Sequence, residues 1–182
     1  EILDKFSLSD NKKTILFFGG GEFGLGKTRT VEFFKTLVSF SHNLQIVAIA
    51  GKNEKMKIAF ENIVEEFEAQ ERVKVLSFTN QVPELMSISD LVITKPGGMT
   101  TTESLASHLP MLIINPIPGQ EEENAEFLEE KGIGIWIKKD TDVNTLLNNI
   151  FSNPDKLEEM KKNTNILAKP NSTKNICEIL LN

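Results

Sequence analysis

The chain of 182 residues contains one cysteine, two histidines, one tryptophan and no tyrosine. The lone Cys177 cannot form a disulfide within the chain or build a cysteine-rich metal site, which is typical of a reducing compartment. His42 and His108 are isolated, so we do not expect either to be catalytic. The sequence therefore gives no support for chemistry carried out by an imidazole.

Long apolar runs and a basic surface are also missing. No apolar run reaches the roughly 18 to 20 residues that span a bilayer, and the first four residues, EILD, lack the basic start of a secretory signal. The net charge of −6 and the pI near 5.1 argue against a nucleic-acid-binding surface. The sequence predicts a cytoplasmic protein that binds no nucleic acid.

What is present is a regular alternation of strand and helix patterns, in a composition (40% hydrophobic, 25% charged) typical of a globular domain. Short apolar runs alternate with amphipathic segments, which predicts a doubly wound α/β domain with a parallel six-stranded, Rossmann-like sheet. The expected strands are residues 14–18, 44–50, 73–78, 91–94, 111–115 and 132–137. We interpret residues 14–152 as the domain, residues 1–13 as an irregular linker, and residues 153–182 as helices that pack on the domain or toward a missing upstream domain.

Loops rich in glycine, proline or polar residues follow the predicted strands. Ligands of such sheets collect beyond the carboxyl ends of the strands, near the point where the strand order reverses. The loops on that edge are residues 19–26, 51–52, 78–81, 95–101 and 116–124. Their shared position is better support for a binding site than any one of them.

Residues 94–103 (TKPGGMTTTE) turn a strand directly into a helix. The two glycines allow close approach to a ligand, and the start of the helix offers free amides and partial positive charge. Glu103 follows about one turn later, which suggests a nucleotide whose ribose is bound by an acid. The alternative is that these residues only cap the helix.

Residues 21–28 (GEFGLGKT) match the phosphate-loop pattern G-x-x-x-x-G-K-[ST]. In that interpretation Lys27 would neutralise phosphates and Thr28 would hold magnesium. No predicted strand ends in the carboxylate that such enzymes need for the metal, and Asp90 precedes its strand. A magnesium-dependent nucleotidase is therefore an alternative, and a nucleotide-binding module without catalysis is another.

Three motifs, residues 19–26 (GGGEFGLG), 95–103 (KPGGMTTTE) and 118–124 (PGQEEEN), together resemble the carboxyl-terminal half of two-domain GT-B glycosyltransferases. The resemblance covers nearly the whole chain. It is to the branch that contains monogalactosyldiacylglycerol synthase and processive diacylglycerol glucosyltransferase, with the peptidoglycan lipid-intermediate N-acetylglucosaminyltransferase more distant. The last motif is most similar to the galactolipid-synthase branch.

The resemblance implies a donor domain that binds UDP-galactose or UDP-glucose and needs neither a cofactor nor a metal. Phe78 and Thr79 would contact the uracil, Glu103 the ribose, and Gln120 and Glu121 the hexose hydroxyls. The backbone amides of Gly98, Met99 and Thr100 would bind the diphosphate, and Gly20 and Gly21 would face the diphosphate or the acceptor. The remaining site residues in these loops are Gly51, Gly97 and Asn124.

From the residues alone, blander interpretations stay open: Phe78 as a core residue, the two glycines as a turn, and residues 120–124 as the start of a solvated helix. The resemblance implies an inverting enzyme that transfers galactose or glucose to diacylglycerol. It also implies that the general base, the acceptor site and any peripheral membrane contact belong mainly to an upstream domain. We therefore expect no catalytic residue in this chain.

Overall fold

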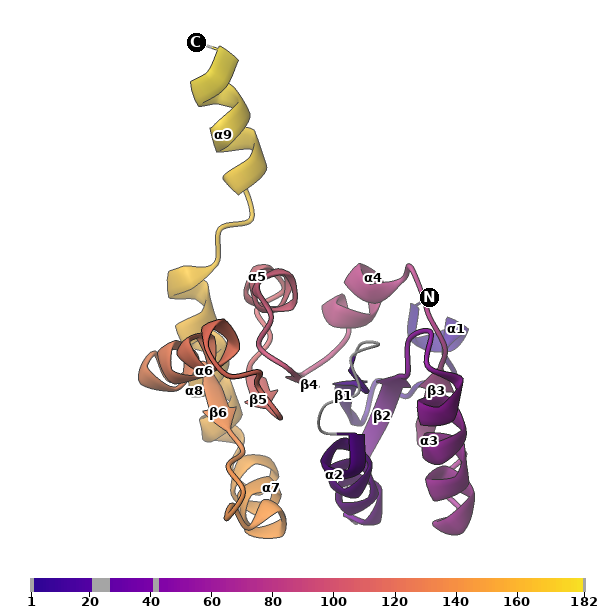
Figure 1. Cartoon of the computed structure of the whole chain (residues 1–182). Helices are drawn as coiled ribbons and strands as arrows, with labels where there is room; N and C mark the ends of the chain where they lie inside the picture. Colours follow the sequence, from indigo (N-terminus) through magenta and orange to yellow (C-terminus); the bar gives the residue numbers. More distant parts are fainter. Residues whose placement is uncertain (1, 21–26, 41–42, 182) are drawn as a thin grey trace.

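The computed structural model describes residues 2–20, 27–40 and 43–181, which form a parallel sheet with helices on both faces (Figure 1). The strands are β1 (Lys13–Phe18), β2 (Leu44–Ile49), β3 (Val73–Leu76), β4 (Leu91–Thr94), β5 (Met111–Ile113) and β6 (Gly134–Trp136). The helices are α1 (Ile2–Lys5), α2 (Lys27–Ser39), α3 (Glu54–Glu66), α4 (Val82–Ser87), α5 (Gly98–Ala106), α6 (Gln120–Glu130), α7 (Val143–Phe151), α8 (Pro154–Leu167) and α9 (Ser172–Leu181).

The six strands lie in the order β3-β2-β1-β4-β5-β6, and every neighbouring pair is parallel. The predicted doubly wound, Rossmann-like sheet is therefore confirmed. The chain leaves β1 toward one edge of the sheet and returns to β4 on the other side of β1, so the order reverses between β1 and β4. This switch point is where a crevice opens beyond the strand ends in such folds.

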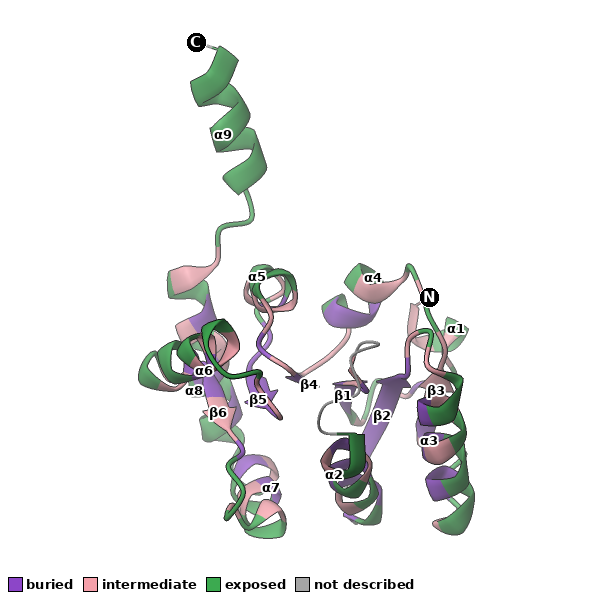
Figure 2. Ribbon diagram, in the orientation of Figure 1, coloured by how far each residue is buried: buried purple, intermediate pink, exposed green. Residues whose placement is uncertain are grey.

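Alternating side chains of the strands supply two cores, one on each face of the sheet. In β1, Ile15 and Phe17 join the core beneath α2, α3 and α7, whereas Leu16 joins the core beneath α4 and α6. Burial of nearly every residue of the central strands explains why they are continuous apolar runs in the sequence. Figure 2 shows this buried layer between the exposed outer faces of the helices.

Three phenylalanine rings fix α2 and α3 against β1. The centroid of Phe34 lies 4.2 Å from that of Phe60 and 5.2 Å from that of Phe17, and Phe17 meets Phe60 edge to face at 5.6 Å. A Cβ atom at Gly19 would lie 2.9 Å from the Phe60 ring, so glycine is required where the chain leaves β1. The core thus determines the first residue of the loop at the switch point.

Several strands are shorter than predicted, and the amino-terminal segment is more ordered. Strand β5 ends at Ile113, and Asn115 adopts a left-handed conformation with φ of 46°, which no strand residue can have. Residues 2–5 form a short helix where an irregular segment was predicted. The following Leu8 is buried, and the backbone of Ser9 exchanges two hydrogen bonds with the side-chain amide of Gln45.

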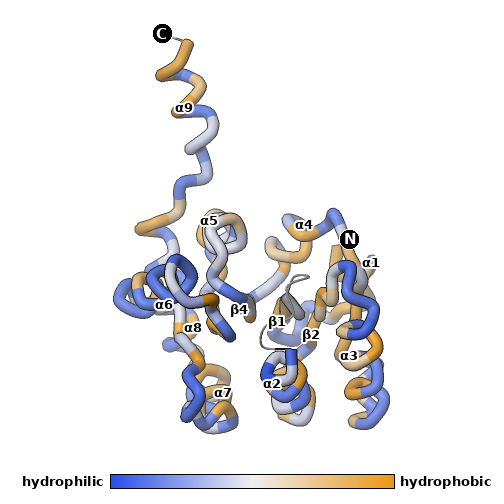
Figure 3. The backbone as a smooth tube through the Cα atoms, viewed as in Figure 1, coloured by the Kyte–Doolittle hydropathy of each residue, from blue (hydrophilic) through white to orange (hydrophobic). Residues whose placement is uncertain are grey.

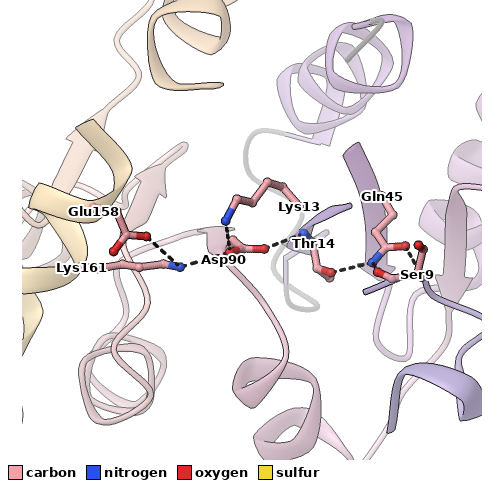
Figure 4. Close-up of polar contacts among 7 residues, drawn as sticks. All are labelled: Ser9, Lys13, Thr14, Gln45, Asp90, Glu158 and Lys161. Atoms are coloured by element: carbon pink, nitrogen blue, oxygen red, sulfur yellow. Dashed lines mark hydrogen bonds and ion pairs between the residues drawn. The ribbon is translucent and has the colours of Figure 1, made fainter. Parts of the chain in front are cut away.

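A polar network joins elements at the amino edge of the sheet, opposite the switch point (Figure 4). Asp90, just before β4, accepts hydrogen bonds from Lys13 at 2.9 Å, from the Thr14 amide at 2.9 Å and from Lys161 of α8 at 3.1 Å. Burial alone would raise the pKa of Asp90, but the Thr14 amide and the two ammonium groups outweigh it, so the pKa lies below its ordinary value.

The last helix, α9, projects from the body of the domain (Figure 1), and none of its residues is buried. Its apolar side chains Ile176, Ile179 and Leu180 are spaced to share one face and are 57%, 77% and 77% exposed. Figure 3 shows apolar residues toward the free end of this helix. Among the described residues, no helix is both long and apolar enough to cross a membrane.

Candidate functional site

A pocket of about 340 Å³ lies beyond the carboxyl ends of the strands at the switch point. It is lined by Phe18, Gly20, Ile49, Gly51, Thr94, Lys95, Gly97, Thr100 and Glu121. These residues come from the ends of β1, β2 and β4, from the first turn of α5 and from the first turn of α6. The pocket is therefore made by the loops that the sequence places on this edge.

Helix α5 presents its amino terminus to the pocket. The N-cap residue is Gly97, which has no side chain that could accept hydrogen bonds from the first amides of the helix. Gly98 and Met99 are exposed, and Met99 is 79% exposed in spite of its apolar side chain. Free amides and the helix dipole make this turn suited to a phosphate.

The loop after β1 enters the pocket through Gly20. Its φ of +94° belongs to a conformation that L-residues rarely adopt, and a Cβ there would have no neighbour within 4 Å among the described residues. Glycine is thus needed for the backbone conformation. Gly21, the second glycine assigned to the site, lies outside the described residues.

The loop before α6 is held in place by the helix that follows it. Oε2 of Glu121 accepts a hydrogen bond of 2.7 Å from the Ile117 amide, while Oε1 faces Gly97 across the pocket. The side-chain amide of Asn124 donates a hydrogen bond of 2.8 Å to the carbonyl of Pro96. The two loops assigned to the diphosphate and the hexose are therefore joined by a direct contact.

The alternative interpretation of Phe78 as a core residue is wrong. Its side chain is 67% exposed beyond the end of β3, and the ammonium group of Lys52 lies 5.6 Å from its ring centroid. Thr79 accepts a hydrogen bond from the Gln81 amide at 3.1 Å, which shapes the loop. Lys52 follows Gly51 of the pocket, so Phe78 lies on the same edge as the pocket and offers an exposed aromatic face.

The structure brings together part of the predicted site as pocket lining and leaves the rest around it. Of the predicted residues, the pocket is lined by Gly20, Gly51, Gly97, Thr100 and Glu121. Glu103 and Gln120 are exposed on α5 and α6 outside the lining. The site prediction did not include Lys95, which lines the pocket, although a cation directly after a strand and before a turn predicted to bind phosphate is a readable signal.

Two described residues of the phosphate-loop alternative lie outside this pocket. Lys27 and Thr28 open α2 and line a different, mainly apolar pocket between α2 and α3, together with Met56. The glycine-rich part of that motif, residues 21–26, and His42 lie outside the described residues. Within the described part of the chain, no group of three or more His, Cys, Asp or Glu side chains could hold a metal ion.

Residues 14–176 match the family described as glycosyltransferase family 28 C-terminal domain. The chain is 35% identical over 180 residues to a processive diacylglycerol beta-glucosyltransferase of Bacillus subtilis, covering 99% of this chain and 46% of that protein. The enzyme of the same name from Bacillus pumilus is 34% identical over 178 residues, covering 98% and 45%. The chain thus spans about half the length of these relatives, which are glucosyltransferases, and the galactolipid assignment stays a prediction.

Solved structures give the same fold. MurG of Acinetobacter baumannii superposes with a TM-score of 0.73 at 24% identity, over 98% of this chain and 52% of that one. A UDP-GlcNAc 2-epimerase from Neisseria meningitidis, bound to UDP-GlcNAc, gives 0.72 at 18% identity, over 99% and 47%. The predicted likeness to one half of a GT-B enzyme is confirmed at the level of the fold.

Proposed function

Because the chain belongs to the glycosyltransferase family 28 C-terminal domain family, we propose that it is the donor-binding half of an inverting enzyme that transfers a hexose from UDP to diacylglycerol. One observation carries the proposal: the amino terminus of α5, without a side-chain cap, opens into the pocket at the switch point. The backbone amides of that turn can donate hydrogen bonds to a diphosphate.

The donor fits this edge of the sheet in an extended pose. The diphosphate lies against Gly98, Met99 and Thr100, with the ribose hydroxyls donating to Glu103 on the exposed side of α5. The uracil lies beside the loop after β3, where Phe78 offers its exposed ring. The hexose points toward the start of α6. The free carboxylate oxygen of Glu121 accepts there from a sugar hydroxyl.

The same turn supports the chemistry. When the bond between the anomeric carbon and the diphosphate breaks, negative charge grows on the departing UDP. Amides fixed at a helix start stabilise that charge without reorganising solvent. Lys95, at the end of β4 and in the lining of the same pocket, adds a full positive charge.

Glucose is the hexose we favour, with galactose as the alternative. The relatives are named beta-glucosyltransferases, and common UDP-hexoses carry an α-linkage, so a β-product requires inversion at the anomeric carbon. Neither Gln120 nor Glu121 distinguishes the two sugars by itself, because each can bond an axial or an equatorial hydroxyl.

The acceptor site and the general base are proposed to belong to an upstream half, because the chain spans about 45% of its relatives. Residues 14–152 then form the donor domain, and residues 153–182 include the helix that returns toward that half. The unburied apolar face of α9 suits such a contact. The upstream half would also make a peripheral contact with the cytoplasmic face of the membrane. By itself the chain is expected to bind donor and transfer little.

Calorimetric titration tests this proposal. We expect UDP to bind the chain in the presence of a metal chelator, and ATP to bind far more weakly with or without magnesium. Binding that requires magnesium and prefers ATP would instead support the phosphate-loop alternative, and nucleotide binding without transfer by the longer protein would leave only a binding module.

A further inference from the structure

A second pocket, of about 330 Å³, lies beside the donor pocket on the same edge of the sheet. It is lined by Arg29, Asn115, Pro116, Ile117, Pro118, Glu122, Trp136, Lys138 and Lys139. The first turn of α6 separates the two pockets, since Glu121 lines the donor pocket and Glu122 lines this one. A ligand held here would therefore be close to the hexose.

The charge of this pocket is opposite to that of the chain. The lining has three cationic side chains, Arg29, Lys138 and Lys139, and one carboxylate, Glu122, although the net charge of the chain is −6. One guanidinium nitrogen of Arg29 donates to the Ile137 carbonyl at 2.8 Å, which fixes the group where β6 ends. The cations come from two segments that are far apart in the sequence and meet only in the fold.

Two large apolar side chains, Trp136 and Ile117, line the pocket together with the cations. The ammonium group of Lys138 lies 5.1 Å from the centroid of the Trp136 ring, and its pairing with Glu129 is long, at 3.6 Å. Ile117 is 40% exposed between two prolines of the loop before α6. Tryptophan and an exposed aliphatic residue next to lysines and arginine are the combination found at membrane–water interfaces.

We propose that this second pocket binds the phosphate of an anionic glycerolipid headgroup in a bilayer. The cations outnumber Glu122 and attract the phosphate, while Ile117 and the exposed part of the Trp136 ring, whose other part packs on the core, lie beside it. The consequence is that the donor half itself touches the membrane, next to the sugar it presents, in addition to any contact made by the upstream half. Lipid binding at this site goes beyond the proposed donor function and does not depend on it, whereas the nearness to the sugar rests on that function.

The 182-residue chain has its own two-sided core, so it can be tested by itself, and Trp136 is its only tryptophan. Vesicles of phosphatidylcholine, with and without phosphatidylglycerol, are titrated while Trp136 emission and co-sedimentation are recorded. We expect a blue shift and pelleting only with the anionic vesicles. The variant K138A/K139A should bind these vesicles about 30-fold more weakly.

The variant K156A/K162A removes the same charge from exposed positions on α8 and should bind like the wild type. An equal loss of vesicle affinity in both variants would overturn the proposal, because the binding would then depend only on net charge. No binding to anionic vesicles would overturn it as well. Soluble glycerol phosphate is the last arm: a shift of Trp136 emission with it, but none with vesicles, would assign the site to a free phosphate ester. These assays contain no donor sugar, so a negative result for lipid binding does not contradict the proposed function.

Discussion

The side-chain amide of Asn124 donates a hydrogen bond of 2.8 Å to the carbonyl of Pro96, across 28 positions of sequence. Pro96 is buried immediately before the turn that opens α5, and Asn124 lies in the second turn of α6. This bond joins the loop proposed to bind the diphosphate to the helix proposed to face the hexose. The resemblance gave Asn124 a place in the site, and the structure gives it a definite partner.

Replacement of Asn124 by alanine should weaken UDP binding about fivefold, because the Pro96 carbonyl loses a partner and the loop loses its anchor. Asn124→Asp should be worse, since a carboxylate would face a carbonyl oxygen. Titration calorimetry with UDP measures both. Asn149→Ala, on the exposed side of α7, is the matched control. Equal affinity of all these variants would remove Asn124 from the positioning of the site.

Glu103→Ala should weaken UDP binding by about 1–3 kcal/mol, the cost of losing charged hydrogen bonds to the ribose hydroxyls. The residue is exposed, so the substitution should leave the thermal unfolding temperature nearly unchanged. Glu126→Ala on α6 makes the same charge change at another exposed position. If the affinity for UDP stays the same in Glu103→Ala, the ribose is bound elsewhere.

Substitutions of Lys95 and Lys27 distinguish diphosphate binding at the switch-point pocket from binding at the phosphate-loop alternative. Lys95 lines the donor pocket and Lys27 lines the separate pocket between α2 and α3. Lys95→Ala should weaken UDP binding about tenfold through loss of a charged contact, whereas Lys27→Ala should have little effect. Calorimetry on the two variants measures this. The opposite ranking would place the diphosphate at Lys27 and contradict the proposed function.

Asp90 should stabilise the fold in a pH-dependent way. Its pKa is lowered in the folded state, so the stabilisation is complete above the ordinary carboxyl pKa and is lost as the pH falls through the lowered value. Asp90→Asn should cost about 1–2 kcal/mol in the free energy of unfolding at neutral pH. Urea unfolding should show the difference from wild type shrinking in acid. A difference that persists below the carboxyl range would point to packing.

Much of the fold could be predicted because buried strands and helix faces require apolar residues at regular positions in the sequence. Strand β4 has the predicted ends, since apolar residues and turn signals bound it clearly. The strands near the edge were overestimated, because β6 pairs with β5 over only three residues while its apolar run is longer. The short helix α1 was missed, because the segment after it is held by burial of Leu8 and by hydrogen bonds between Ser9 and Gln45, which form only in the folded domain.

The site was predictable as a set of loops and not as a set of contacts. Parallel strands bring their following loops to one edge, so the glycines of the pocket could be placed from sequence. The hydrogen bond between Asn124 and Pro96 and the exposure of Phe78 depend on how separate loops settle against one another. The cationic second pocket has the same origin, because Arg29 and Lys138 come from segments with no shared motif.

Helix α9 contributes no buried residue to the domain, so the domain should fold without it. Deleting residues 172–182 should leave the urea midpoint and UDP affinity of the chain unchanged within error. In the proposed longer protein with an upstream half, the same deletion should lower the proposed transferase activity, since the apolar face of Ile176, Ile179 and Leu180 would lose its contact. A charged substitution, Ile179→Glu, should act like the deletion, and Lys174→Glu on the same helix should not. A large loss of stability in the truncated chain would instead mean that α9 folds back onto its own domain.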